Sequence, residues 1–456
     1  MTAEPAQTVA RLRQTFDTGR TLDIGWRREQ LSALADMMTA NSAAIVEALE
    51  ADLGRPPFET WLADIATTVR EARHAARHVA SWSRRRRRPL EWTQLPGRGW
   101  IEYEPYGTVL VIGTWNFPFQ LTLGPAVGAL AAGNTVVLKP SEIAPAASAL
   151  MADLVPRHLD ADAVAVVEGG AEVCGQLIAQ GLDRVMFTGG TGVGRRVMAA
   201  AAEHLTPVTL ELGGKSPVIV ASDADIDGAA RRIAWVKLMN SGQVCIAPDY
   251  ALVHSGVRDR FVERICATFK AFRAGSDPGM RIVNEAHFAR LKGMLAGTSG
   301  QIVHGGVAAP ERLTVEPTVV VDPDPHEPLM TEEIFGPILP VVTVDSVTEA
   351  IDFVRTRPKP LAAYLFTRSR TTRDEVVRRV PAGGMVVNHL LFQVATARLP
   401  FGGVGPSGMG AYHGRFGFEE FSHRKSVLTK PVRPDLTRMF YPPYSAGAIS
   451  LVRRML

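Results

Sequence analysis

From Tyr106 onward, short apolar runs alternate with stretches of helical character, and this alternation restricts the fold more than any other feature of the chain. The apolar runs have the length of buried strands, and the clearest are residues 108–112, 135–138, 163–167, 184–187 and 217–220. The segments between them, such as 121–132 and 144–155, have the length of helices. Strands that alternate with helices indicate parallel strands joined by crossover helices. We therefore expect an α/β fold with a doubly wound sheet.

Two other parts of the chain have their own predicted secondary structure. A second α/β block is expected after residue 245, with strands near 250–254, 338–344 and 385–388. The first hundred residues are predicted to be mainly helical, with one helix ending near Gly54 and another over 59–82.

Five consecutive arginines, Arg84 to Arg88, follow the second of these helices. Such a run can form a patch for anions or nucleic acid, or it can be a solvated helix end whose side chains pair with acidic neighbours. No nucleic-acid-binding motif surrounds the run. We therefore expect a helix end that leads into an arm, and no nucleic-acid partner.

Composition sets broad limits on the class of protein. A chain of 456 residues suggests two to three domains of about 150 residues each. Its net charge of +4 is small for this length, so composition alone gives no indication of nucleic-acid binding. Its three cysteines show neither a disulfide framework nor metal-ligand spacing, so we expect a reducing compartment and no metal. The N-terminus lacks the features of a signal peptide, and no apolar run approaches the roughly 18 residues that span a bilayer. We expect a soluble, cytoplasmic protein.

Two residues have local sequences suited to covalent catalysis on a carbonyl group. Cys245 ends the segment Asn240-Ser-Gly-Gln-Val-Cys245, and Glu211 lies in Thr209-Leu-Glu-Leu-Gly-Gly-Lys. A thiolate attacks the carbonyl carbon, and a carboxylate can later take a proton from water to release the acyl group. On chemistry alone this pairing is weak, because the chain has 46 acidic residues. A lone cysteine is also more often a small buried residue, as we expect for Cys174 and Cys266.

Further polar groups follow predicted strands, where doubly wound folds place functional side chains. The Asn116 amide can donate to an oxyanion or cap a turn, and the residues alone leave both roles open. Lys139 and Glu142 can hold ribose hydroxyls or form a polar turn. The run Phe187-Thr-Gly-Gly-Thr-Gly-Val-Gly194 allows backbone N–H groups to approach a pyrophosphate, although its spacing differs from the standard fingerprint.

Together with motifs downstream, these segments resemble those of the NAD(P)-dependent aldehyde dehydrogenases. The added motifs are residues 116–128, 332–337, 399–405, 407–414 and 421–426, and most of them are similar to the class 3 branch. The resemblance extends from Trp26 to about Pro443. It implies an α/β fold of four parts, which are a Rossmann-like cofactor-binding domain (1–87 and 106–212), an α/β catalytic domain (213–425), a small β oligomerisation arm (88–105 and 426–440, with a strand near 426–432) and a C-terminal tail (441–456).

The resemblance also implies roles for the matching residues. Cys245 would be the nucleophile, Glu211 the base that activates water, and Asn116 an oxyanion donor together with a backbone N–H group. The residues implied to bind the cofactor are Lys139, Glu142, Gly189, Thr191, Gly194, Glu333 and Phe335. One departure is Gly190, which stands where many members have serine or another polar residue, and the loss of that hydroxyl would remove one phosphate contact.

Cofactor and assembly follow from the same resemblance. Glu142 can accept hydrogen bonds from a ribose 2′-hydroxyl and should repel a 2′-phosphate, which favours NAD. Class 3 relatives often accept NADP, so NADP use is also possible. Like that branch, the chain lacks the longer N-terminal tail of tetrameric classes, and a homodimer is implied. His389 and His413 are expected to be structural or to line the site mouth, since the implied mechanism needs no histidine.

The substrate is the least constrained feature. Four apolar residues, Trp115, Phe117, Trp235 and Met239, suggest a mouth suited to aromatic or medium-to-long aliphatic aldehydes. The alternatives are a coenzyme A-acylating aldehyde dehydrogenase or acyl-thioester reductase, which would not need Glu211 as a hydrolytic base, and a catalytically silent structural relative. The tail from Tyr441 to Leu456 is apolar with two arginines and could touch a membrane surface, but we expect a packed or disordered tail.

Overall fold

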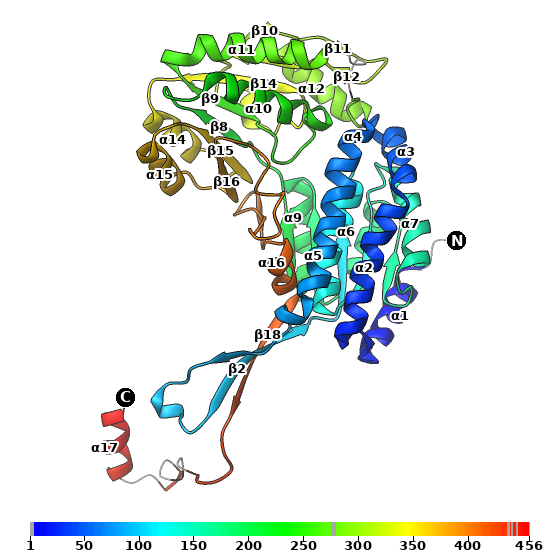
Figure 1. Ribbon diagram of the computed structural model, residues 1–456, viewed down its shortest axis with the longest axis vertical. Helices are drawn as coiled ribbons and strands as arrows, with labels where there is room; N and C mark the ends of the chain where they lie inside the picture. Colours follow the sequence, from blue (N-terminus) through cyan, green and yellow to red (C-terminus); the bar gives the residue numbers. More distant parts are fainter. Residues whose placement is uncertain (1–3, 275–279, 436–437, 439–440, 444–445, 456) are drawn as a thin grey trace.

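The computed structural model describes residues 4–274, 280–435, 438, 441–443 and 446–455. Two α/β units, each built on its own sheet, form the body of the molecule, and a thin antiparallel arm extends away from it (Figure 1). The α/β fold expected from the sequence is confirmed.

The first unit contains a six-stranded sheet in the order β17-β7-β6-β3-β4-β5. Its strands are β3 (Thr108–Ile112), β4 (Thr135–Lys139), β5 (Val164–Val166), β6 (Arg184–Thr188), β7 (Val208–Glu211) and β17 (Gly408–Met409). The crossover helices are α6 (Pro118–Ala132), α7 (Pro145–His158), α8 (Ala171–Ile178) and α9 (Thr191–Ala202). All pairs except β17–β7 are parallel, and the strand order reverses between β3 and β6. Doubly wound sheets bind ligands at such a switch point.

The second unit contains a seven-stranded sheet in the order β10-β13-β14-β9-β8-β15-β16. Its strands are β8 (Pro217–Val220), β9 (Tyr250–His254), β10 (Gln301–His304), β13 (Thr318–Val321), β14 (Ile338–Val344), β15 (Ala362–Phe366) and β16 (Gly384–Val387). The helices are α10 (Ile226–Leu238), α11 (Ser255–Arg273), α12 (Glu285–Gly297), α13 (Pro328–Thr331), α14 (Val347–Arg355) and α15 (Arg370–Arg379). A short hairpin, β11 (Ala308–Ala309) with β12 (Thr314–Val315), completes the unit.

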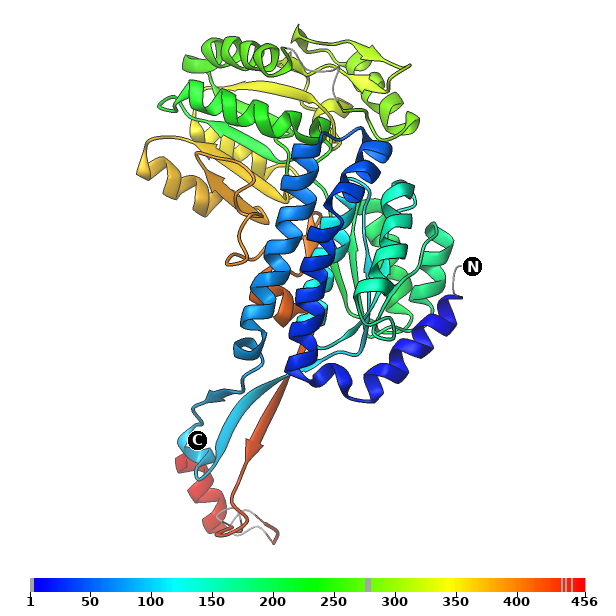
Figure 2. The ribbon, with the colours of Figure 1, turned by 45° about the vertical axis from the view of Figure 1, so that its right-hand side comes forward.

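The N-terminal helices cover the first unit. They are α1 (Pro5–Asp17), α2 (Ile24–Ala40), α3 (Ser42–Leu53), α4 (Pro57–Thr60) and α5 (Thr67–Trp82), with the short 3₁₀ turn η1 (Arg20–Leu22) and the π-helical segment η2 (Trp61–Ala66). Helices α2 and α5 lie side by side, and α5 packs on α6 (Figure 2). The helical layer predicted for the first hundred residues is therefore present.

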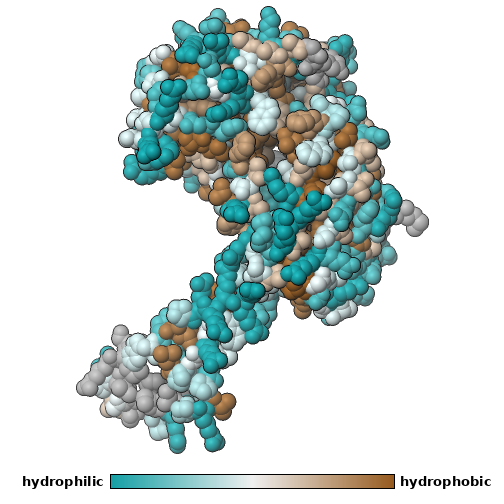
Figure 3. Space-filling view, viewed as in Figure 1, coloured by the Kyte–Doolittle hydropathy of each residue, from teal (hydrophilic) through white to brown (hydrophobic). Residues whose placement is uncertain are grey.

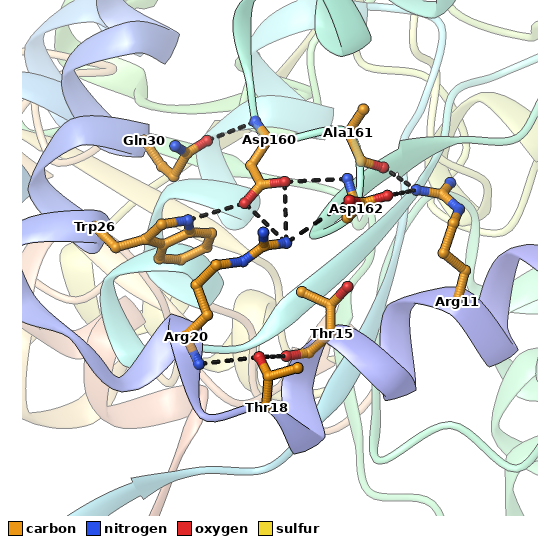
Figure 4. A network of polar contacts seen from close by, with 9 residues as sticks. All are labelled: Arg11, Thr15, Thr18, Arg20, Trp26, Gln30, Asp160, Ala161 and Asp162. Carbon is orange, nitrogen blue, oxygen red and sulfur yellow. Dashed lines mark hydrogen bonds and ion pairs between the residues drawn. The ribbon is translucent and has the colours of Figure 1, made fainter.

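A polar network around Asp160 fastens this layer to the loop between α7 and β5 (Figure 4). The Asp160 carboxylate accepts a hydrogen bond from Trp26 Nε1 at 3.0 Å and pairs with Arg20 at 3.1 Å. The Asp160 backbone N–H donates to Gln30 Oε1 at 2.8 Å, and Arg11 donates to the carbonyl of residue 161. These contacts hold the start of the chain against the sheet that carries the site.

The arm is a three-stranded antiparallel sheet of β1 (Arg86–Arg88), β2 (Arg98–Pro105) and β18 (Ser422–Thr429), with the short turn η3 (Trp92–Gln94) at its end. The strand predicted near 426–432 thus lies earlier in the chain, at 422–429. The expected helix end at the arginine run is also corrected, because α5 stops at Trp82 and the arginines enter β1. Pairing along β2 favours the extended backbone there. The predicted acidic partners are present, since Arg85 pairs with Glu102 and Arg86 with Glu419.

Helices α16 (Gly414–Glu420) and α17 (Ala446–Met455) belong to the last part of the chain, and both views place α17 near the far end of the arm (Figures 1 and 2).

Parts of the predicted segments 1–87, 426–440 and 441–456 lie outside the described residues, namely 1–3, 436, 437, 439, 440, 444, 445 and 456. One strand of the predicted catalytic segment 213–425, β17, joins the first sheet. Within the described residues, no helix is both long and apolar enough to cross a membrane.

Candidate active site

The side chain of Cys245 lies where two cavities meet. The sheet-side cavity, of about 580 Å³, opens at the carboxyl ends of β3, β6 and β7. The second cavity, called the tunnel below, has a volume of about 310 Å³ and is lined mainly by apolar side chains. Cys245, Leu121 and Phe401 line both cavities. A molecule in one cavity can therefore meet a molecule in the other at this cysteine.

A tight turn, η4 (Met239–Gly242), precedes Cys245, the predicted nucleophile, and is called the nucleophile turn below. Asn240, Ser241 and Gly242 all have positive φ values, of 50°, 50° and 73°. Such a run is unfavourable for residues other than glycine and persists only when its surroundings enforce it. Gln243 contributes, since its Nε2 donates to the Asn240 carbonyl at 3.0 Å. A side chain on Gly242 would overlap the Gly336 carbonyl, so this position requires glycine.

Asn116 lies beside this turn, as the oxyanion role requires. It follows β3, is 2% exposed, and lines the sheet-side cavity. Its Nδ2 donates to the Gln243 carbonyl at 3.1 Å, and the Asn240 amide donates to the Asn116 carbonyl at 3.1 Å. A side-chain amide has two N–H donors. One holds the nucleophile turn, which leaves the other for a group in the cavity.

Arg55 is a buried cation that the sequence analysis missed. Its side chain is 0% exposed and pairs with Asp64 at 2.5 Å, which is also 0% exposed. The guanidinium donates to the Asn116 carbonyl and to Asn240 Oδ1, the latter at 2.9 Å, and it stacks over the Phe117 ring. Arg55 thus ties the Asn116 loop to the nucleophile turn. In the sequence, Arg55 stands between Gly54 and two prolines. This pattern indicated only the end of a helix, and nothing in it pointed to a buried cation.

Glu211 ends β7 and lines the same cavity as Cys245 and Asn116. It is 3% exposed, and neither carboxyl oxygen has a hydrogen-bond partner among the described residues. Burial raises the pKa of Glu211 well above its ordinary value, and the charge of Glu420 adds to the rise. Burial also raises the pKa of the Cys245 thiol to about 12, with added effects from the charges of Glu333 and Glu211. The thiol therefore needs a base to ionise.

The sheet-side cavity fits a nicotinamide dinucleotide. Its volume lies in the range of about 300–1,000 Å³ typical of ligand sites. Gly189, Gly190 and Gly192, at the start of α9, line it, and the space beside Gly190 and Gly192 is open within 4 Å. Glu333 and Phe335 line the cavity at a different point. Open backbone at a helix N-terminus suits a pyrophosphate.

Four of the residues predicted to bind the cofactor do not line this cavity. Lys139 and Glu142 form an ion pair with each other at 2.7 Å beyond the end of β4, the neighbour of β3. Thr191 donates to the carbonyl of residue 406 at 3.3 Å. Gly194 is pressed against Leu212, so it allows α9 to pack closely on the sheet. The open space at Gly190 leaves room for a larger side chain at this position.

The tunnel contains three of the four residues predicted to contact the aldehyde, namely Phe117, Trp235 and Met239. Trp115 is the exception, because it lines the sheet-side cavity. Its ring packs edge-on against Phe335 at a centroid distance of 5.4 Å and lies 5.5 Å from His287. These contacts keep Trp115 on the side of the sheet-side cavity.

Most of the residues that line the tunnel were not identified in the sequence analysis. The additional lining residues come from η2, α5, α6, the two neighbours of Cys245 and the loop before residue 401, and they are Leu62, Ala63, Ala66, Thr67, Arg70, Gln120, Val244, Ile246, Leu391, Phe392, Val394 and Ala395. The apolar spacing in 59–82 indicated a helix but not which face would line a site.

Two histidines were expected to be structural or to line the site mouth. His389 packs on the tunnel residues Trp235 and Phe392, and buried His413 lies 3.6 Å from Glu71. Within the described residues, no cluster of three potential metal ligands exists.

Comparisons with known proteins agree with this geometry. A profile of the aldehyde dehydrogenase family matches residues 2–427. The chain is 42% identical to the Rattus norvegicus protein named "Aldehyde dehydrogenase, dimeric NADP-preferring", over 97% of this chain and 98% of the relative. It is 42% identical to "Aldehyde dehydrogenase family 3 member H1" of Arabidopsis thaliana, over 100% and 95%. The substrate-bound structure of Staphylococcus aureus AldH has a TM-score of 0.94 at 39% identity and covers 98% of both chains.

The chain therefore belongs to the aldehyde dehydrogenase family. It is an NAD(P)-dependent aldehyde dehydrogenase, and the resemblance to the class 3 branch is confirmed by its relatives from family 3.

Proposed function

We propose that the chain oxidises aromatic or medium-to-long aliphatic aldehydes to carboxylic acids, with Cys245 as the nucleophile. The observation that carries this proposal is the position of Cys245 at the junction of a dinucleotide-sized cavity and an apolar tunnel. An aldehyde in the tunnel presents its carbonyl to the thiol, while its apolar body contacts Phe117, Trp235 and Met239. Burial of apolar substrate surface in such a tunnel is favourable.

The chemistry begins when the Cys245 thiol loses its proton to water and becomes the nucleophilic thiolate. The thiolate attacks the aldehyde carbon and gives a thiohemiacetal. Its oxyanion accepts hydrogen bonds from Asn116 Nδ2 and a backbone N–H group, and such a donor is typically worth about 10²–10³ in rate.

A bound nicotinamide cofactor would supply the acceptor for the hydride that leaves the substrate carbon. Gly189, Gly190 and Gly192 would hold its phosphates, and Glu333 its ribose. The thiohemiacetal then becomes a thioester on Cys245. Glu211 takes a proton from water, the hydroxide attacks the thioester, and the carboxylic acid leaves as the thiol is restored. Holding the reactants together replaces a bimolecular encounter by an intramolecular one.

A panel of aldehydes, followed by NADH or NADPH absorbance, tests the substrate class. We expect benzaldehyde and octanal to have higher kcat/KM values than acetaldehyde. Cys245→Ala should abolish turnover and keep cofactor binding, whereas the matched control Cys266→Ala should remain active. Substantial turnover by Cys245→Ala would refute the assignment.

Coenzyme A separates hydrolysis from acyl transfer. Glu211 has no polar partner among the described residues and lines the cavity that contains Cys245, which favours a hydrolytic base. We expect free carboxylate as the product even with coenzyme A present. Formation of acyl-coenzyme A would instead support the acylating alternative.

We further propose that NAD is favoured over NADP, although two relatives are named NADP-preferring. The reason is Glu142, whose carboxylate should repel a 2′-phosphate. Burial opposes ionisation of Glu142, but the hydrogen bond from Lys139 lowers its pKa below the ordinary value, so the charge is present at neutral pH. Glu142→Gln should lower the KM for NADP relative to that for NAD. An unchanged ratio would show that Glu142 does not set the choice.

We also propose a cytoplasmic homodimer that assembles through the arm. The arm exposes large apolar side chains, such as Trp92 at 61% and Leu95 at 55%, and exposed apolar groups of this kind favour association. Light scattering after size-exclusion chromatography tests the assembly, and a monomeric mass would refute it. Cell fractionation tests the compartment, and recovery in the membrane fraction would refute that part.

A further inference from the structure

The wall of the tunnel is mainly apolar, and one of its side chains carries a formal charge. Eighteen residues line it, and besides the Cys245 thiol their polar side chains are Thr67, Gln120 and Arg70. Arg70 alone among them carries a permanent charge, because a guanidinium does not lose its proton in proteins. Among the residues that the structure describes, no other cation and no carboxylate lines the tunnel. A substrate in the tunnel therefore meets one positive charge.

Arg70 lies at the solvent end of the tunnel. Its side chain is exposed, as are those of Trp235 and Phe392, whereas Met239 and Ile246 near Cys245 are buried. Arg70 is the last residue that α5 contributes to the tunnel wall, and its exposed side chain contrasts with the buried residues beside Cys245. A substrate whose aldehyde carbon lies at Cys245 would therefore direct its opposite end toward Arg70.

The Arg70 guanidinium is available to a ligand. The structure gives it no hydrogen bond or ion pair with any described residue. The adjacent residue Glu71 is turned inward, where it accepts a hydrogen bond from the Gly414 N–H and lies beside His413. Carboxylates are thus not positioned to neutralise Arg70, and the charge remains for an incoming group.

Two further arginines extend the positive charge along the same helix. Arg73 and Arg77 line, with Arg70, an adjoining groove of about 390 Å³. Of these, Arg73 approaches Asp36 at 3.9 Å, and both groups are well exposed. Hydrophilic side chains gather on this face over the middle of the molecule, where Figure 1 shows α5 (Figure 3). A positive rim of this kind attracts anions toward the tunnel.

We propose that the tunnel selects aldehydes that carry an anionic group, such as a carboxylate, at the end remote from the aldehyde, and that Arg70 binds this group. The inference rests on the proposed function and narrows its substrate class. The apolar body of the substrate fills the tunnel, and the guanidinium fork donates two parallel hydrogen bonds to the carboxylate.

A charge series at constant shape tests this proposal. The substrates are 4-formylbenzoate, its neutral methyl ester and 4-formylphenyl-trimethylammonium, and the readout is the ratio of their kcat/KM values within each enzyme. We expect the wild type to favour 4-formylbenzoate over the ester by about fivefold, as for a solvent-exposed ion pair, and to disfavour the cation. The preference should weaken as salt is raised.

Variants assign the preference to Arg70. Arg70→Gln should bring the ratio of 4-formylbenzoate to ester close to one, and Arg70→Lys should give an intermediate value because a lysine lacks the fork. Arg77→Gln is the matched control, since Arg77 is on the same helix and exposed but does not line the tunnel. It should lose only the contribution of the rim and keep most of the wild-type ratio. A wild-type ratio of one or below, or a ratio that Arg70→Gln leaves unchanged, would overturn the proposal.

A binding measurement separates this proposal from the catalytic one. Terephthalate cannot be oxidised but has the predicted shape and charge, so it should protect Cys245 from alkylation by iodoacetamide, as measured by mass spectrometry. Protection should be weaker with dimethyl terephthalate and in Arg70→Gln. Charge-dependent protection without turnover of any aldehyde would contradict the proposed function and support the tunnel specificity, and equal protection by both compounds would refute the specificity.

Discussion

Replacement of Arg55 by lysine tests whether the site depends on a buried guanidinium. Arg55 makes three polar contacts, with the Asp64 carboxylate at 2.5 Å, the Asn116 carbonyl and Asn240 Oδ1 at 2.9 Å, and its Cζ lies 4.6 Å from the centre of the Phe117 ring. A lysine ammonium is a compact point charge that can keep the Asp64 pair, but it lacks the fork that reaches the other two acceptors.

The size of the effect follows from these contacts. A hydrogen bond to a charged group contributes about 1.5–3 kcal/mol, so the loss of two would cost about 3–6 kcal/mol. The Asn116 carbonyl keeps its hydrogen bond from the Asn240 amide at 3.1 Å, which places the cost near the lower limit. With a typical stability of about 5–15 kcal/mol, the Arg55→Lys protein should still fold.

The effect on activity should be selective for the chemical step. Removal of an oxyanion donor costs about 10²–10³ in rate, and Arg55→Lys displaces Asn116 rather than deleting it, so we expect kcat to fall by about tenfold. Cofactor affinity, measured by fluorescence titration, should change little, because the glycine turn and Glu333 do not contact Arg55. Thermal unfolding measures the loss of stability in parallel.

Arg27→Lys is the matched control for a buried arginine. Arg27 is 6% exposed and donates to the carbonyls of Thr21 and Ala131, away from the cavities. It should lose stability without a selective fall in kcat. If Arg55→Lys kept its kcat while folded, or if both variants lost activity in the same proportion, the positioning role of Arg55 would be refuted.

Three other predictions concern the carboxylates. Glu211→Gln should give a burst of NADH followed by a slow steady rate, since an amide cannot take a proton from water, and a burst that falls as much as the steady rate would contradict this. Burial raises the pKa of Glu211, and the negative charge of Glu420 raises it further. Because Glu211 must be ionised to act, Glu420→Gln should lower this pKa and move the acidic limb of the kcat–pH profile to lower pH. The control Glu419→Gln should leave that limb in place. A methyl group on Gly213 would overlap the Glu333 carboxylate, so Gly213→Ala should raise the cofactor KM by about tenfold, and an unchanged KM would count against the ribose role.

The strands and the first half of the site could be predicted because their determinants are local. Strand β3 was predicted over its observed range, and β4 and β6 to within one residue, because strands buried on both faces form continuous apolar runs. Asn116 was placed after a predicted strand, where doubly wound folds put functional side chains, whereas the site role of Glu211 came from the family resemblance. The position of Cys245 beside them came only from family resemblance, since it belongs to the second unit.

The tunnel could not be predicted in the same way, because its walls come from segments far apart in the sequence. Ala66 and Arg70 on one helix meet Phe392 from a loop more than three hundred residues later. Each segment has an ordinary local pattern, and only tertiary packing decides which face of the helix is turned toward Cys245. Trp115 shows the same limit, since its aromatic contacts with Phe335, not its own loop, keep it out of the tunnel.

The nucleophile turn gives the physical reason why such sites resist local prediction. Asn240 and Ser241 adopt a positive φ that their own sequence disfavours. The conformation is held from outside, because the Asn240 N–H donates to Glu59 at 2.9 Å, its side chain accepts from Arg55, and Ser241 Oγ donates to the Met280 carbonyl at 2.6 Å. Helix α4 and its flanking residues therefore shape the catalytic turn although they contribute nothing to the reaction. Substitutions there should alter kcat before they unfold the protein, since the strained turn depends on contacts that the rest of the fold does not need.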